Sequence, residues 1–475
     1  MKTGNSIRQR VGRNAFSPTA AVLVIVLWIA FGLVSIALYF GQSMLFNLQA
    51  ADNYEASVEA DQAIEGAARY ISAVLTNLQV QVQSQGTNMP GVLVLPGVIQ
   101  AYTPQSGQTP FTQTYQGQDV PVGNAHFWLI GRDTGGTSNV NSGVPVFALV
   151  DEASKLNLNT ATLDQLEALP FMTPDLAASI LNWRTNASTV VAGGAKLEYG
   201  MLNPPYTCKN APFETIDELK LVIGATTDIL YGADINLNGI LDANEGNQNT
   251  LPSSVANLDN GLNAGILDYV TVYSREPNTQ INGLPRTNVN NRQALRTALQ
   301  GVLSPDQVTQ ILQKIGTNPK FTSVLQFYMT SGMNADDFAK VADMLIASND
   351  PYTPGLVNVN TASATVLACL VGVNNAQALI AYRQAHPDQL ATVAWVAQVL
   401  SPDDASAAGQ YITAKSYQFT ADVAAIGHHG RGYRRTLFVF DTSSGTPQII
   451  YRRDLNQMTR ALGTARQNWQ LTGNM

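Results

Sequence analysis

The sequence predicts an α+β protein, in which a long N-terminal helix packs on an antiparallel sheet and a large α-helical domain is inserted between two groups of strands. Three observations lead to this fold class. An uncharged apolar run near the N-terminus continues as an amphipathic pattern, strand patterns occur towards both ends of the chain, and a short asparagine motif occurs three times between them. With 475 residues, 45% of them hydrophobic, the chain is long enough for two or three domains.

The N-terminal segment has the pattern of a membrane anchor. Residues 1–19 contain no acidic residue and four basic ones: Lys2, Arg8, Arg10 and Arg13. The unbroken apolar run 20–40 would form a helix about 31 Å long, which is the thickness of a bilayer core. The positive-inside rule then predicts a cytoplasmic leader at 1–19 and export of the bulk of the chain. A cleaved secretory signal is the alternative, but its apolar region is shorter, about 7 to 15 residues.

The amphipathic pattern and the strands set the expected domain boundaries. Apolar residues recur every three or four positions from residue 48 to 78, which extends the helix as a stem to about residue 80. Strand patterns cover these segments: 125–132, 144–150, 416–426, 436–440 and 448–452. Because sequential strands usually lie side by side, the two groups share a sheet only if the block between them is a separate domain. The predicted division is stem and first strands at 41–152, an inserted α-domain at 153–415, and second strands with a C-terminal tail at 416–475.

The asparagine motif marks repeated units within the predicted insertion. Its copies are 156–161 (LNLNTA), 287–290 (TNVN) and 357–362 (VNVNTA). Each is expected to be a short extended segment that opens a helix, with an Asn or Thr accepting a bond from the first free helical N–H groups. The residues after the first and third copies follow one plan, which predicts two helix-hairpin-helix units.

Helix-hairpin-helix units elsewhere bind nucleic-acid phosphates through glycine-rich hairpins. Here the first hairpin, 170–173, has no glycine and the second, 371–374, has one. The chain has a net charge of −7, and four of its basic residues stand in the leader, so the rest is a poor match for phosphate backbones. We therefore interpret the hairpins as packing elements. A membrane-anchored DNA-binding or DNA-uptake protein is the alternative function, and a calcium-dependent surface adhesin is a third.

One segment carries a metal-binding pattern. Residues 234–245 (DINLNGILDANE) match D-x-[DN]-x-[DN]-G-x5-E at every constrained position. The predicted Ca²⁺ ligands are the side chains of Asp234, Asn236 and Asn238, the carbonyl of Ile240, Asp242 directly or through water, and bidentate Glu245. Asn, Asp and Gly are also common in turns, which explains the composition but not the full pattern. Because no long helix flanks the loop, we expect a structural calcium clip rather than a sensor.

The remaining polar candidates are weaker. None of the four histidines (His126, His386, His428 and His429) has a companion at metal-binding or nucleophile spacing. No catalytic or cofactor-binding residue is therefore predicted, and an enzyme is not expected. The basic cluster of Arg431, Arg434 and Arg435 is interpreted as a solvated turn. Cys208 and Cys369 either form a disulfide or stay buried thiols, and the second interpretation is favoured.

Several of these residues resemble one family. Residues 151–161 (DEASKLNLNTA) are similar to the D-E-x-x-K-[IL]-N-[IL]-N-x-A motif of the general secretion pathway protein K (GspK) family, the largest minor pseudopilin of the type II secretion system. The segments 210–213 (NAPF) and 217–219 (DEL) and the third asparagine motif extend the resemblance, which runs from the anchor to about residue 455. It implies a pilin-like fold with an inserted α-domain that holds calcium, a single-pass inner-membrane anchor and a periplasmic bulk.

The resemblance also implies a function. Family members stand at the tip of a short periplasmic pseudopilus with the smaller minor pseudopilins, so we expect a structural subunit that caps this tip and assists protein export across the outer membrane. Contacts through the stem helix would join it to the other minor pseudopilins, and secreted proteins are further candidate partners. Prepilin peptidase would cut after Ala15, after Ala20 or not at all, and the two cuts would leave Ala20 or Ile25 at the fifth position. A subunit without glutamate at that position lacks the charge pair that joins a neighbour above it, which suits a terminal cap.

Overall fold

The computed structural model describes the following residues: 18–84, 92–95, 98–101, 111–132, 143–186, 188–242, 245, 262, 264–280, 282–458 and 460–466. Residues 1–17 of the leader, with the candidate cleavage site after Ala15, lie outside them. The chain divides into two compact units, Met1–Ala56 and Ser57–Met475, and each is described by itself.

The longest element is helix α1 (Pro18–Ser84), as the sequence predicts. In the first unit, the apolar side chains between residues 22 and 40 are exposed. The helix is long and apolar enough to cross a membrane. Its exposed apolar surface therefore fits a single-pass anchor, because lipid would cover side chains that water does not favour.

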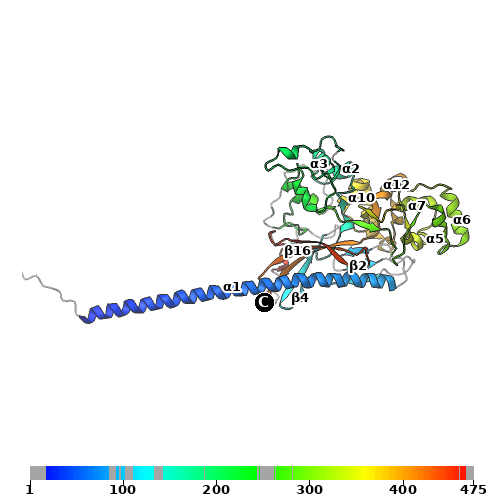
Figure 1. Ribbon diagram of the computed structural model, residues 1–475. Coiled ribbons are helices and arrows are strands. Elements are labelled where there is room, and N and C mark those ends of the chain that lie inside the picture. The colour runs from blue at the N-terminus through cyan, green and yellow to red at the C-terminus, as the bar shows by residue number, and fades with distance from the viewer. Residues whose placement is uncertain are drawn as a thin grey trace, which may run out of the picture. The chain divides into compact units, whose positions relative to one another are not determined.

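In the second unit, α1 packs on an antiparallel sheet (Figure 1). The buried stripe consists of Ala60, Ala63, Ile64, Ala67, Ala68, Ile71, Val74, Leu75 and Leu78. These residues lie against aromatic side chains of the strands, among them Phe127, Phe419 and Phe438. The alanines let the helix approach the strands closely, and the spacing of three and four keeps the apolar residues on one face. The apolar stripe that we expected to dock on other stems is thus covered by the chain's own sheet from residue 60 to 78.

The sheet joins strands from both ends of the chain. Its order is β17-β16-β15-β5-β4, and β6 also pairs with β15. The bounds are β4 Val120–Val122, β5 Ala125–Ile130, β6 Val150–Asp151, β15 Gln418–Ile426, β16 Arg434–Asp441 and β17 Gln448–Asp454. β15 pairs antiparallel with β5 on one side, with Val423 opposite Leu129, and with β16 on the other. The predicted antiparallel sheet under a long helix is confirmed.

One strand prediction needs correction, and one sheet was not predicted. The expected strand at 144–150 is wrong in extent, because only a bridge at Phe147 and the short β6 are extended and paired there. A second, three-stranded sheet that the sequence analysis did not predict contains β1 Val92–Leu95, β2 Val98–Ala101 and β3 Phe111–Thr114.

The intervening segment, residues 153–415, is mainly helical and lies beyond the sheet from α1 (Figure 1). Its α-helices are α2 Leu163–Glu167, α3 Pro174–Arg184, α4 Thr227–Tyr231, α5 Arg292–Gln300, α6 Pro305–Lys314, α7 Val324–Ser331, α8 Ala335–Val341, α9 Ala364–Val371, α10 Val373–Ala385, α11 Val396–Val399 and α12 Pro402–Ala408. Its strands are β7 Leu156–Asn157, β8 Val270–Thr271, β9 Arg275–Pro277, β10 Thr287–Asn288, β11 Leu345–Ile346, β12 Tyr352–Pro354, β13 Val357–Asn358 and β14 Ile412–Thr413.

Three modules of one design make up most of this segment. Each begins with the asparagine motif as a two-residue strand, continues through short helices and ends with a strand that pairs parallel to the first. The pairs are β7 with β8, β10 with β11 and β13 with β14, so the modules cover 156–271, 287–346 and 357–413. The first and third modules share one apolar core, and the second has its own. The sequence analysis found the repeated motif, but it did not predict a helical pair after the second copy.

Candidate metal centre

The predicted calcium loop follows the short helix α4, in the first module. At its start, both carboxylate oxygens of Asp234 accept backbone N–H groups, from Asn238 at 2.9 Å and from Gly239 at 2.7 Å. Gly239 has φ +77°, which suits a residue without Cβ. The side-chain oxygen of Asn238 accepts the N–H of Ile240 at 3.0 Å. These bonds fold the first half of the loop around the Asp234 carboxylate.

Glu245 closes the second half. Its Oε1 accepts the N–H of Asn236 at 3.2 Å and its Oε2 accepts the N–H of Asp242 at 3.1 Å. Asp242 Oδ2 in turn accepts the amide groups of Asn236 at 2.7 Å and Asn238 at 3.0 Å. The structure therefore brings together the side chains of all five residues predicted to supply side-chain ligands. Ile240, whose carbonyl is the sixth predicted ligand, is buried beside them.

The loop is suited to a hard cation. Every predicted ligand atom is oxygen, and Asp234, Asn236, Asn238 and Glu245 are all buried. Among the described residues, none donates a hydrogen bond to the buried Oδ1 of Asn236, which is costly unless another group binds it. Burial raises the pKa of Asp234, against the opposing charge of Arg132, and burial also raises the pKa of Glu245. A divalent cation would balance the negative charge of the clustered carboxylates and coordinate Oδ1 of Asn236.

Two arginines from the sheet hold the outside of the loop. Arg132, which follows β5, donates to the carbonyl of Leu237 at 2.8 Å. Arg435 of β16 donates to the same carbonyl at 2.8 Å and to that of Asn236 at 2.5 Å. Each guanidinium also has its own carboxylate, Asp268 for Arg132 and Asp422 for Arg435. The interpretation of Arg435 as part of a solvated turn is wrong, because its side chain is fully buried within a strand.

The asparagine motifs have one geometry in all three modules. The first asparagine accepts the N–H of the residue two positions on, at 2.8 to 2.9 Å: Asn157 from Asn159, Asn288 from Asn290 and Asn358 from Asn360. The helix caps are other residues: Thr162, Asn291 and Ser363. The expected capping role therefore belongs to residues just beyond the paired asparagines.

The second asparagine of each motif binds a distant loop. Asn159 exchanges two hydrogen bonds with the backbone of Phe213, and Asn290 does the same with Phe321. In the third module, Asn360 donates to the carbonyl of Leu390 and accepts the indole N–H of Trp395. Each module is thus closed by one side-chain amide.

Asp151 and Glu152 connect the sheet with the modules. Asp151 accepts hydroxyl groups of Thr361 and Ser416, both at 2.5 Å, and the amide of Asn358. Glu152 accepts the hydroxyl groups of Thr271 and Thr420 and pairs with Lys155. Burial raises the pKa of Asp151 to about 6, although the hydrogen bonds from Ser416 and Thr361 oppose this. The two acids tie the beginning of the intervening segment to its end.

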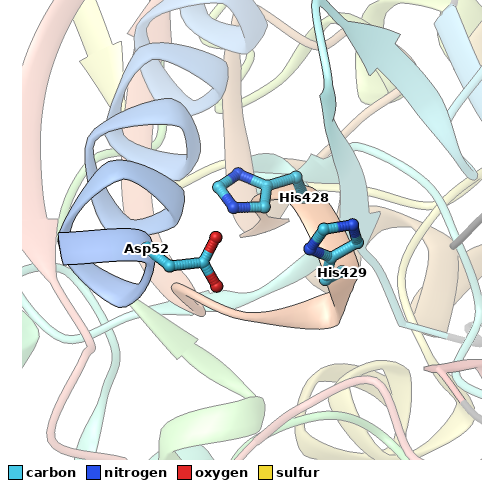
Figure 2. Close-up of side chains that lie close together, drawn as sticks. All are labelled: Asp52, His428 and His429. Atoms are coloured by element: carbon cyan, nitrogen blue, oxygen red, sulfur yellow. The ribbon is translucent and has the colours of Figure 1, made fainter. Parts of the chain in front are cut away.

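The histidines and cysteines are distributed over the fold. Figure 2 shows His428 and His429 in the turn between β15 and β16. His428 Nδ1 lies 2.6 Å from the carboxylate of Glu59 in the second unit. Cys208 and Cys369 are both buried thiols that donate to backbone carbonyls, those of Asn182 and Thr365, so the favoured interpretation is confirmed.

Comparisons with known proteins found a matching family model and a similar solved structure. The family model described as "Type II secretion system (T2SS), protein K" matches residues 146–231. One solved structure that resembles the chain is "The Crystal Structure of the GspK-GspI-GspJ complex from enterotoxigenic Escherichia coli Type 2 Secretion System". The similarity has a TM-score of 0.37 and 12% sequence identity, and it covers 86% of this chain and 99% of that one. No curated protein matches the sequence.

The matched segment contains Asp151, Glu152, Lys155 and the first asparagine motif, whose side chains form the network between sheet and modules. It ends at Tyr231, three residues before the candidate calcium loop. The motif that carried the resemblance therefore lies inside the segment that the family model recognises. Residues 146–231 of this chain are therefore similar to protein K of the type II secretion system.

Proposed function

We propose that this chain is the minor pseudopilin that caps the tip of the type II secretion pseudopilus and so assists protein export across the outer membrane. Its role is structural rather than catalytic. The observation that carries this proposal is the pairing of Asp151 with Phe419 on neighbouring antiparallel strands. The chain leaves the sheet and returns to it at one point, so the intervening segment is an addition to a complete helix-and-sheet subunit.

The bulk of the intervening segment provides a mechanism for capping. A subunit with only helix and sheet leaves room for the next subunit to stack on it. Here the segment 153–415 occupies the space beyond the sheet, and the chain lacks the glutamate that would pair with a subunit above. In this account the anchor keeps the N-terminus in the cytoplasm and the modules in the periplasm, where secreted proteins meet them.

Partner contacts would use parts of α1 that the sheet leaves free. Exposed apolar side chains continue beyond the expected membrane span in the first unit: Met44, Leu45, Phe46, Leu48 and Tyr54. We assign the docking of other minor pseudopilins to these residues, in place of the stripe from residue 60 to 78. GspI and GspJ accompany GspK in the solved complex, so the counterparts of these two proteins are the proposed partners.

The calcium loop contributes stability in this account. We assign Ca²⁺ to Asp234, Asn236, Asn238, Ile240, Asp242 and Glu245 as a structural ion. At a Ca²⁺ concentration 100 times the Kd, binding would stabilise the folded chain by about 2.7 kcal/mol. Chelation should therefore lower the thermal midpoint of the wild-type chain, and Glu245→Gln should abolish the difference. Equal midpoints with and without Ca²⁺ in the wild type would refute the assignment.

Capping is tested by removing the added bulk. Residues 153–415 would be replaced with a short Asn-Gly turn, because β6 and β15 are already antiparallel neighbours. Pseudopili that assemble with this variant should be longer than those of the wild type when measured by electron microscopy.

A second variant controls for loss of the subunit itself. An unrelated folded domain of similar size, fused between the same two strands, should restore short pseudopili if bulk is the cause. Unchanged length in the deletion variant, with the protein present in the membrane, would contradict capping.

A further inference from the structure

We propose that cation binding in the loop 234–245 is thermodynamically coupled to the attachment of the intervening segment to the sheet, and that Arg132 and Arg435 are the positioning residues that couple them. This inference rests on the proposed calcium site. It goes beyond that proposal because it assigns the ion an effect on the junction of two parts of the fold, rather than on the loop alone.

The contacts place both arginines on the backbone that carries the ligands. Their guanidinium groups converge on the carbonyls of Asn236 and Leu237. Asn236 and Asn238, whose side chains are predicted ligands, stand on either side of Leu237. Fixing these two peptide groups therefore fixes the positions of two ligand side chains, as outer-shell partners do in other metal sites.

Backbone conformation supports the same reasoning. Leu237 has φ +54°, a left-handed conformation that a leucine adopts only at a cost in energy. The two arginine hydrogen bonds to its carbonyl, both 2.8 Å long, favour this conformation. Without them the segment 236–238 would relax, and the ligand side chains would separate from Asp234 and Asp242.

The two arginines do not replace the cation, because other carboxylates already balance their charges. Arg132 forms an ion pair with Asp268, and buried Arg435 forms one with Asp422. Each arginine thus has a carboxylate of its own, and Asp234, Asp242 and Glu245 stay without full compensation. The arginines position the loop, and the ion compensates the negative charge of the loop's carboxylates.

A third contact comes from the chain after the sheet. The amide of Asn238 donates to the carbonyl of Ala461 at 3.2 Å. Ala461 belongs to the core on the face of the sheet that also buries Trp128 and Ile130. The loop therefore touches three segments of the helix-and-sheet part: the end of β5, the start of β16 and the C-terminal segment. An ion that orders the loop would therefore also stabilise its contacts with these three segments.

Linkage makes the coupling measurable in both directions. If attachment to the sheet raises calcium affinity by some factor, calcium must strengthen attachment by the same factor. Arg132→Lys and Arg435→Lys keep the charge next to Asp268 and Asp422 but lose the planar fork of donors that reaches the carbonyls. We expect each to weaken Ca²⁺ binding by about tenfold or more, measured by calorimetric titration of the full chain in detergent.

Arg434→Lys is the matched control. Arg434 precedes Arg435 in β16, but it donates to Asp61 of α1 at 2.8 Å rather than to the loop. This variant should bind Ca²⁺ with wild-type affinity. Thermal unfolding of all variants in excess chelator would show whether a loss of affinity reflects a loss of fold.

Hydrogen exchange tests the opposite direction. Adding Ca²⁺ to the wild type should slow amide exchange in the loop and also in β16 and in the segment around residue 461. In Arg435→Lys, the protection of β16 should be reduced. Wild-type affinity in both lysine variants, or protection confined to the loop, would overturn the coupling. Absence of Ca²⁺ binding by the wild type would instead refute the calcium site itself.

Discussion

At the scale of single residues, side-chain amides determine how each module closes. Asn360 is 1% exposed, and it joins the start of its module to Leu390 and Trp395. Asn360→Ala would leave a buried carbonyl and a buried indole N–H without partners. We expect it to lower the free energy of unfolding by about 2 kcal/mol or more, measured by denaturant titration. A change below about 0.5 kcal/mol would show that the amide does not close the module.

Asp151 predicts a pH dependence. Its pKa is about 6 in the folded chain, above the ordinary value of 3.8 that applies when unfolded. The folded state therefore binds the proton more tightly, so this carboxyl favours folding at low pH, and its contribution falls as pH rises from about 4 to about 6. The shift corresponds to about 3 kcal/mol.

Asp151→Asn removes this titration. Unfolding of wild type and variant would be compared at pH 4.5 and pH 7, and only the change between the two pH values is informative, because the variant also alters hydrogen bonds. The wild type should lose more stability than the variant on going to pH 7. Equal losses in the two proteins would show that Asp151 does not titrate in this range.

The sequence predicted residue chemistry better than residue placement. The candidate calcium ligands could be named because a cation loop needs fixed spacing, and the structure gathers their side chains. Arg132 and Arg435 were missed, because their contacts with the loop join residues 105 to 199 positions apart. No local pattern reports such a contact. An arginine inside a predicted strand, as Arg132 is in 125–132, was the one available signal.

At the scale of elements, the amphipathic stripe of α1 and its packing on the sheet were predicted correctly, but the same stripe was also expected to contact other stems. Periodicity shows which face of a helix is covered, but it does not show by what. Leu75 is fully buried against the chain's own sheet. Substituting such residues therefore tests folding before it tests assembly.

Leu75→Ala should destabilise the folded chain by about 3 kcal/mol, because it leaves a cavity in the helix–sheet core. Asn77→Ala is the control, since Asn77 lies on the exposed face of the same turn and should change stability by less than about 0.5 kcal/mol. Thermal unfolding of both variants would measure the difference. Similar midpoints for the two would argue against this packing.

At the scale of the whole molecule, the strands at 125–130 and 418–454 were predictable from alternating apolar residues. That they share a sheet was predictable because the block between them is helical and could form a separate domain. The short parallel strand pairs that close the modules were not, because two-residue strands carry no periodicity. In the sequence, the paired asparagines were the feature that indicated all three modules. Their repetition matters because it divides the intervening segment into two apolar cores that add bulk in one direction from the sheet.

The central claim is that the chain occupies only the terminal position of the pseudopilus. Gold labelling of a peptide tag in an exposed loop of the intervening segment, such as the turn at Gly283, would test it on sheared pseudopili by electron microscopy. The account predicts gold at one end of each fibre and none along its length. Gold distributed along the fibres would contradict it.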